Sequence, residues 1–283
     1  MRLDRMSIAE SFDLINGEDA SIASAVAAAR SDICRAIELV VAAFREGGRL
    51  IYVGAGTSGR LGVLDATECP PTFLTEPHQV QGVIAGGFEA LTRSVEGAED
   101  HPETARAAMD QREVGPGDVV FGVATGGTTP YVHAALERAK ERGAKTVFLA
   151  CVPSEQLGDA ADVSIRVITG PEVVTGSTRM KAGTATKMVL NMVTTIALVQ
   201  TGKVYQNLMV DVNTRSNAKL VDRGTRIVQT LTGRSREAAR ALLEDAGGHV
   251  KTALVMHARN VDRAAAQELL LAEDGRLDRL IET

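Results

Sequence analysis

A short apolar run that leads directly into a glycine-rich turn constrains the fold of this sequence more than any other feature. Residues 49–53, Arg-Leu-Ile-Tyr-Val, have the β-prone apolar character of a buried parallel strand. Gly54, Gly56 and Gly59 follow at once, and glycine lets a backbone turn sharply and come close to a ligand. This order of residues predicts a strand, a tight loop and a helix.

Two hydroxyl side chains, Thr57 and Ser58, lie where that helix is expected to begin. A helix N-terminus presents unpaired N–H groups and a positive dipole end, which suits phosphate and other anions. The loop is not a Walker loop, because no Gly-Lys-Ser/Thr follows the glycines. A dinucleotide site is disfavoured, because the strand expected at residues 80–85 has no acid at its end. On the loop alone, a glycine turn that binds nothing remains the alternative.

Segments typical of strands and of helices alternate over the first two thirds of the chain. Strands are expected at about residues 49–53, 80–85, 118–124, 145–151 and 163–168. Between them, residues 102–111 and 130–142 have a helical pattern, and Gly143 is expected to end the second helix. We therefore expect an α/β fold, a doubly wound parallel sheet of five strands whose ligand binds beyond their carboxyl ends.

Helices are also expected before and after the segments that form this sheet. Apolar residues recur with helical spacing over residues 21–46, and residues 180–200 form a long, mostly apolar helix. No convincing strand follows. We expect an N-terminal helical segment at 1–46, an α/β domain at 47–210 and a C-terminal helical region at 211–283.

Charge and composition limit the classes of binding partner that are expected for the protein. The net charge is −5, no run of Lys or Arg occurs and aromatic residues make up 3%, so nucleic acid and anionic membrane are not expected. No apolar segment reaches the roughly 18 residues of a membrane span, and residues 1–6 lack a signal-peptide core. Cys34, Cys69 and Cys151 have no metal spacing, which favours reduced thiols and a cytoplasmic location.

Two acids, Glu68 and Glu99, stand out by their position. Glu68 follows the glycine loop in Asp-Ala-Thr-Glu-Cys-Pro-Pro, and we expect it near the carboxyl end of a strand. Glu99 lies in a polar stretch after the second strand and is expected near Glu68 in space. Paired carboxylates in a cleft can divide acid and base work. The residues alone leave open that both are solvated loop acids or helix caps.

Long, composition-specific strings give the sequence a resemblance to the N-acetylmuramic acid 6-phosphate etherase family. These enzymes of peptidoglycan recycling contain a sugar-isomerase-type (SIS) domain that binds a phosphosugar. The resemblance covers almost the whole chain, in order, and rests on GRLIYVGAGTSGRLGVLDATECPPTF, VIAGG, VEGAED, EVVTGSTRMKAGTATKMVLNM and GKVYQNLMVDV.

The resemblance implies a reaction and two catalytic residues. Glu68 matches the family's proton donor, and Glu99 matches its second catalytic acid. The family cleaves the lactyl ether by elimination and rehydration, without a metal or organic cofactor, and releases N-acetylglucosamine 6-phosphate and D-lactate. Two carboxylates suit this chemistry, because a base removes the C2 proton while an acid protonates the lactate oxygen leaving C3.

The resemblance also implies that neutral hydroxyls and loop amides at helix starts hold the phosphate. The expected substrate-binding residues are Gly56, Thr57, Ser58, Gly126, Gly127, Thr128, Thr129, Ser177 and Thr178. Arg179 and Lys181 either add charge to this site or are surface cations at a helix end. The apolar residues after Met180, and the habit of SIS domains to pair, predict a homodimer.

The sequence departs from the family's pattern in two places. Gly126 and Thr128 stand where the family usually has a serine and an arginine. Affinity or selectivity is expected to differ here if that arginine contacts substrate. The chain also begins closer to its first helix than family members do.

Three other functions stay open. A regulatory SIS protein senses phosphosugars without turning them over, and retention of both Glu68 and Glu99 argues against it. A phosphosugar isomerase moves the C2 proton but keeps the ether, and the length of the etherase-like strings argues against it. A nicotinamide enzyme is the most distant of the three, because the ribose-binding acid is missing.

Overall fold

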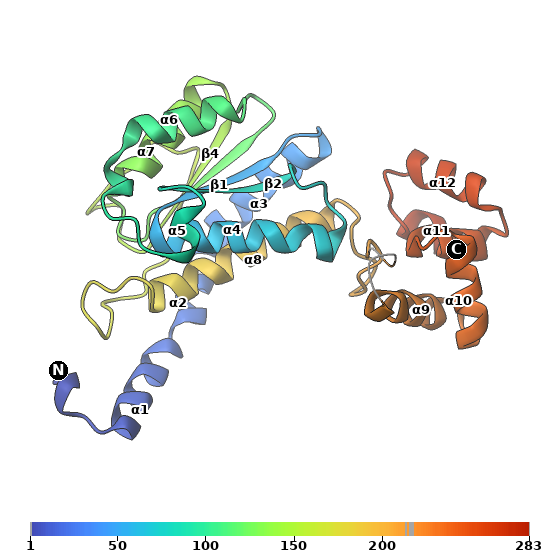
Figure 1. Ribbon diagram of the computed structural model, residues 1–283, viewed down its shortest axis with the longest axis horizontal. Helices are drawn as coiled ribbons and strands as arrows, with labels where there is room; N and C mark the ends of the chain where they lie inside the picture. The colour runs from blue at the N-terminus through green and yellow to red at the C-terminus, as the bar shows by residue number, and fades with distance from the viewer. Residues whose placement is uncertain (1, 213, 215–217, 283) are drawn as a thin grey trace. The chain divides into compact units, whose positions relative to one another are not determined.

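Five short strands form one parallel sheet in the computed structural model, which describes residues 2–212, 214 and 218–282 (Figure 1). The strands are β1 (Leu50–Gly54), β2 (Val80–Ile84), β3 (Val119–Val123), β4 (Lys145–Ala150) and β5 (Val163–Arg166). Their order is β2-β1-β3-β4-β5, and every neighbouring pair is parallel. The predicted five-stranded, doubly wound α/β sheet is confirmed.

Helices cover both faces of this sheet, with α6 and α7 on one face and α4 and α8 on the other (Figure 1). The helices up to residue 200 are η1 (Leu3–Arg5), α1 (Ile8–Asp19), α2 (Ile22–Ala28), α3 (Arg30–Arg45), α4 (Gly56–Phe73), α5 (Glu89–Thr92), η2 (Ala98–Asp100), α6 (Pro102–Gln111), α7 (Pro130–Glu141) and α8 (Lys181–Gln200). The single helical region expected over 21–46 is two helices, because the backbone leaves the helical conformation at Ala29.

Alternate residues of β1 face opposite sides of the sheet. Ile51 and Val53 pack with buried residues of α6 and α7 in one cluster, whereas the hydroxyl of Tyr52 donates to a carbonyl of α8 over 3.4 Å. Both α6 and α7 begin at a proline, which is favoured in a first helical turn. Gly143, with φ of +84°, follows the end of α7, so the predicted stop is confirmed.

Glycines let α4 lie close to the sheet. A Cβ atom at Gly59 would lie 2.6 Å from Cγ1 of Ile84, and a Cβ atom at Gly62 would lie 2.9 Å from Cβ of Tyr52. Any larger residue at these positions therefore forces the helix and the strands apart. The close packing fixes the start of α4 relative to β1 and β2.

The chain divides into two compact units, one of Met1–Thr67 with His78–Thr194 and one of Glu68–Pro77 with Thr195–Thr283. The second unit has its own buried cluster, which includes Tyr205, Val228 and Leu243. Its helices after α8 are α9 (Ala218–Thr232), α10 (Arg236–Asp245), α11 (Val250–Arg259), α12 (Arg263–Ala272) and α13 (Asp278–Ile281). The predicted C-terminal helical region is confirmed.

One helix, α8, is long and apolar enough to cross a membrane by length and composition alone. This finding corrects the expectation that no segment reaches that length. The apolar stretch of α8 is 56% buried inside the structure, and helices of protein cores share this length and composition.

Candidate active site

The topology places two of the predicted loops at neighbouring strand ends. From β1 the chain crosses to β2 on one side, while β3, β4 and β5 follow on the other, so the order reverses between β1 and β3. In open parallel sheets, ligands bind at such a switch point, beyond the carboxyl ends of the strands. The loop after β1 and the loop after β3 flank this point.

The loop after β1 turns directly into α4. Gly56 has φ of +53°, a conformation that glycine adopts without strain, and it is the first residue of the helix. Thr57 is half-buried and Ser58 is 8% exposed, so both hydroxyls lie within the first turn rather than on a solvated flap. The first N–H groups of an α-helix have no partner within the helix, which makes this turn suitable for phosphate.

The loop before α8 lies against the same turn. A Cβ atom at Gly183 of α8 would lie 3.5 Å from the methyl group of Thr57 and 3.4 Å from the carbonyl oxygen of Thr178. Ser177 is half-buried and Thr178 is exposed. The structure therefore brings the first and third predicted loops together.

The start of α8 is filled by the protein itself. The carboxylate of Glu172 accepts hydrogen bonds from the N–H groups of Lys181, at 3.0 Å, and Ala182, at 2.9 Å. Lys181 is 2% exposed and pairs with Glu18 of α1 at 2.5 Å, so it is not a surface cation, and its charge is already balanced. Arg179 is exposed.

The loop after β3 has a shape that only glycine allows. Gly127 has φ of +84°, and a Cβ atom there would lie 2.7 Å from Cδ2 of Leu157. A ring nitrogen of His133 lies 2.6 Å from the carbonyl oxygen of Gly127. Thr129 precedes α7, but its hydroxyl makes no capping hydrogen bond, and Gly126 and Thr128 are exposed.

A small cavity of about 160 Å³ joins the start of α4 to the stretch that carries Glu99. Gly56, Arg60, Ser94, Glu96 and Glu99 contribute to its lining. The hydroxyl of Ser94 donates to Glu96 over 2.9 Å, and the guanidinium of Arg60 donates to the carbonyl of Arg93 over 3.0 Å. The structure thus brings Glu99 to the predicted phosphate-binding turn.

Glu68 does not lie where the sequence places it. It is an exposed residue inside α4, which continues through Pro70 and Pro71 to Phe73. With a rise of about 1.5 Å per residue, Glu68 lies about 18 Å along the helix axis from Gly56. The expectation of a position near the carboxyl end of a strand is therefore wrong. Glu68 belongs to the second unit and Glu99 to the first.

Sequence reasoning missed Arg60, Glu172 and Glu18. Arg60 stands in the glycine string, where its charge beside an anion-binding turn was a usable signal. Glu172 precedes Lys181, the first residue of α8, by nine residues, and Glu18 pairs with Lys181 across 163 positions. No local sequence pattern predicts either contact.

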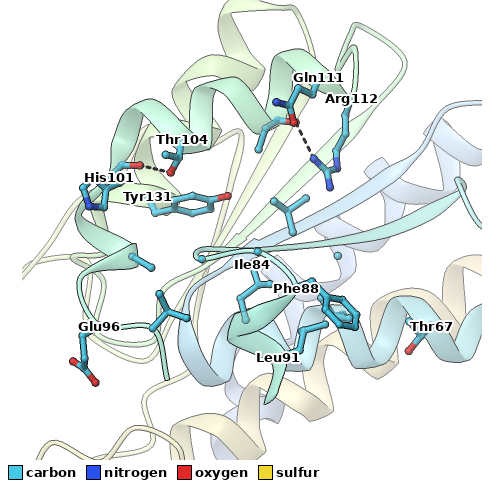
Figure 2. A pocket seen from close by; sticks show the side chains of 18 residues that line it. Thr67, Ile84, Phe88, Leu91, Glu96, His101, Thr104, Gln111, Arg112 and Tyr131 are labelled. Atoms are coloured by element: carbon cyan, nitrogen blue, oxygen red, sulfur yellow. Dashed lines mark hydrogen bonds between the residues drawn. The ribbon is translucent and has the colours of Figure 1, made fainter. Parts of the chain in front are cut away.

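A second, larger cavity of about 860 Å³ lies beside β2, the edge strand of the sheet (Figure 2). Its volume suits a small molecule. Ile84, Phe88 and Leu91 give it apolar walls, and Tyr131 and Arg112 reach into it from α7 and from the end of α6 (Figure 2). Burial raises the pKa of the Tyr131 hydroxyl, which therefore stays protonated near neutral pH.

Burial shifts the pKa of two other groups near these helices. Burial, and to a lesser degree the charge of Glu172, raises the pKa of the Cys151 thiol to about 12, so this cysteine is not a nucleophile at neutral pH. Burial also raises the pKa of Asp65 on α4, although a hydrogen bond of 2.5 Å from the amide of Asn191 on α8 opposes the shift.

Known proteins resemble this chain over nearly its full length. It is 56% identical over 276 residues to the N-acetylmuramic acid 6-phosphate etherase of Gloeobacter violaceus. The matched region covers 98% of this chain and 90% of that protein. It is 55% identical over 275 residues to the protein of the same name from a Picosynechococcus species, with coverage of 97% and 91%.

Domain models and a solved structure agree with the fold. The model of the glucokinase regulatory protein N-terminal SIS domain matches residues 32–140, and the SIS domain model matches residues 94–196. The phosphoheptose isomerase of Neisseria gonorrhoeae superimposes with a TM-score of 0.51 at 16% identity, over 68% of this chain and 98% of that one. This likeness shows a shared fold.

Proposed function

The chain belongs to the family of N-acetylmuramic acid 6-phosphate etherases, and from this premise we propose how its own residues perform the family's reaction. The protein is a carbon–oxygen lyase of cell-wall sugar recycling. It cleaves the lactyl ether of N-acetylmuramic acid 6-phosphate and yields N-acetylglucosamine 6-phosphate and D-lactate.

The reaction needs two positioned proton transfers. In the open-chain sugar, the aldehyde at C1 acidifies the C2 proton, which a base removes while an acid protonates the lactate oxygen leaving C3. Water then adds to the unsaturated aldehyde. Each positioned transfer accelerates such a step by about 10²–10⁴-fold. We assign the two transfers to Glu68, as the proton donor, and Glu99.

The observation that carries the assignment of Glu99 is the cavity that it shares with Gly56 at the start of α4. A sugar whose phosphate lies on that turn has its reacting carbons within reach of a carboxylate there. The assignment of Glu68 rests on its match with the family motif alone, because Glu68 does not line that cavity and lies about 18 Å along α4 from Gly56.

Phosphate binding is assigned to the start of α4, with the amides and hydroxyls of Thr57 and Ser58. The loop of Gly126, Gly127, Thr128 and Thr129 lies at the neighbouring strand end and contributes hydroxyls and amides. The hydroxyls of Ser177 and Thr178 complete the set. The amides that begin α8 are excluded, because Glu172 already occupies them.

We also propose a cytoplasmic homodimer. Met192, Ile196 and Val199 of α8 are each more than a third exposed, and their spacing of four and three residues puts them on one face of the helix. An apolar stripe on a long helix favours pairing with a second copy. Light scattering at micromolar concentration that reports a monomer contradicts this part of the proposal.

The decisive experiment incubates the pure protein with N-acetylmuramic acid 6-phosphate and measures released D-lactate. The match with the domain of a regulatory protein makes a phosphosugar sensor the second candidate. A sensor binds the sugar without releasing D-lactate, and an isomerase exchanges the C2 proton but leaves the ether intact. Catalytic release of D-lactate supports the etherase, and its absence rejects it.

A further inference from the structure

Arg60 is held in place but has no ionic partner in the described chain. Its guanidinium donates one hydrogen bond, to the carbonyl of Arg93 over 3.0 Å. Within residues 2–212, 214 and 218–282, no carboxylate lies within ion-pair distance of it. A guanidinium carries five N–H donors in a planar fork, so most of its hydrogen-bonding capacity remains available.

The cavity that Arg60 lines is too small for a whole phosphosugar. Its volume of about 160 Å³ lies below the 300–1,000 Å³ range typical of ligand pockets. It therefore suits one substituent of a ligand. The turn proposed to hold the phosphate, Gly56 to Ser58, begins about one helical turn before Arg60, and Glu99 also lines the cavity.

The substrate of the proposed reaction carries two anionic groups, the phosphate and the carboxylate of the lactyl ether. That carboxylate is attached to the carbon that bears the ether oxygen. A catalytic carboxylate that works at C2 or at the ether oxygen therefore comes close to a second negative charge. A cation beside Glu99 relieves this repulsion, and a guanidinium binds a carboxylate with two parallel hydrogen bonds.

We propose that Arg60 binds the lactyl carboxylate of the substrate and so selects for the ether over phosphosugars that lack it. The assignment rests on the proposed etherase function. Lys181 does not compete for this role, because Glu18 already pairs with it. In this arrangement the phosphate lies on the α4 turn, the lactyl group enters the cavity and Glu99 lies beside the reacting carbons.

The test compares two ligands that differ only in the lactyl group. For Arg60→Met we expect kcat/KM for N-acetylmuramic acid 6-phosphate to fall by about 10- to 100-fold, the usual weight of a hydrogen bond to a charged group. The inhibition constant of N-acetylglucosamine 6-phosphate should change by less than about twofold. Arg60→Lys, which keeps the charge without the fork, should fall between Arg60→Met and the parent protein.

Arg93→Met is the matched control, because it removes a neighbouring arginine and keeps the carbonyl that Arg60 contacts. It should change neither constant, and thermal unfolding shows whether each variant is folded. Equal weakening of both ligands by Arg60→Met means that Arg60 binds the phosphate or braces the loop, and overturns the proposal. No change for either ligand overturns it as well.

Failure of the proposed function gives a different result. If the parent protein releases no D-lactate, both sugars can be titrated directly by calorimetry, because neither turns over. Selective weakening of N-acetylmuramic acid 6-phosphate in Arg60→Met then supports the assignment in a sensor. Unselective weakening, or none, rejects it.

Discussion

Two helices begin side by side in this molecule, and the protein fills the N-terminus of only one of them. At the start of α8, the carboxylate of Glu172 accepts from the amides of Lys181 and Ala182. At the start of α4, no carboxylate of residues 2–212, 214 and 218–282 accepts from the amides of Gly56, Thr57 or Ser58. The start of α8 therefore holds an internal carboxylate, whereas under the proposed function the start of α4 receives the phosphate of the substrate.

The largest expected effect comes from the carboxylate beside the open start. Glu99→Gln keeps the shape and polarity of the side chain but cannot cycle a proton, so D-lactate release should fall by about 10²–10⁴-fold. Thermal unfolding should stay unchanged, because Glu99 is exposed. A variant that releases D-lactate at the parent rate would show that Glu99 is not a catalytic residue.

Glu68→Gln sharpens this result by assigning acid and base. D-lactate release should again fall by about 10²–10⁴-fold, with the fold intact. Exchange of the C2 proton with solvent deuterium should persist in this variant and disappear in Glu99→Gln if Glu99 is the base. The opposite pattern exchanges the two roles. A double variant no slower than either single one indicates two groups that act as a unit.

A negative charge introduced at the start of α4 should block anion binding there, as Glu172 does at the start of α8. Ser58→Asp puts a carboxylate against the bound phosphate, where two unit charges 4 Å apart repel by about 4 kcal/mol at an effective dielectric constant of 20. Binding of N-acetylglucosamine 6-phosphate should weaken by more than about 100-fold. The control is Ser58→Asn, which has the same shape without the charge and tests whether this buried site tolerates the volume. Equal binding by both variants places the phosphate elsewhere.

Weakening the carboxylate that accepts from the first amides of α8 should lower the stability of the fold without slowing the reaction. Glu172→Gln retains one acceptor oxygen for two N–H groups, so the free energy of unfolding should fall by about 1 kcal/mol, as for loss of a helix cap. For a chain of this size, that lowers Tm by about 2 °C. D-lactate release per folded molecule should stay within about twofold of the parent. A loss like that of Glu99→Gln would place Glu172 in the reaction.

The smallest effect is expected where the two helices meet further along, at Asp65 of α4 and Asn191 of α8. Burial raises the pKa of Asp65, so the neutral form is favoured in the folded state. This contribution to stability is fully present below the unfolded value of 3.8 and is lost as pH rises through the raised pKa.

Asp65→Asn should remove that pH dependence. The free energy of unfolding of the variant, measured by urea titration across pH 3.5 to 8, should rise relative to the parent as pH increases. A constant difference over this range would show that Asp65 does not titrate as its burial implies.

The features that the sequence predicted correctly are those that depend on short stretches of the chain. The strand, loop and helix around Gly56 follow from an apolar run and glycine spacing, and the parallel sheet follows from alternation. Glu68 was misplaced because α4 continues through Pro70 and Pro71, residues that normally end a helix. The pair of Lys181 with Glu18 was invisible, because it joins residues 163 positions apart.

The glycines at positions 59 and 62 have a consequence for the thermodynamics of recognition. They press α4 onto Ile84 and Tyr52, so its first turn cannot tilt or slide without breaking the sheet contact. A ligand that docks on this turn therefore orders little additional backbone. Because backbone ordering is a major entropic penalty of association, a preset turn lets even a small anion bind through a handful of amide contacts.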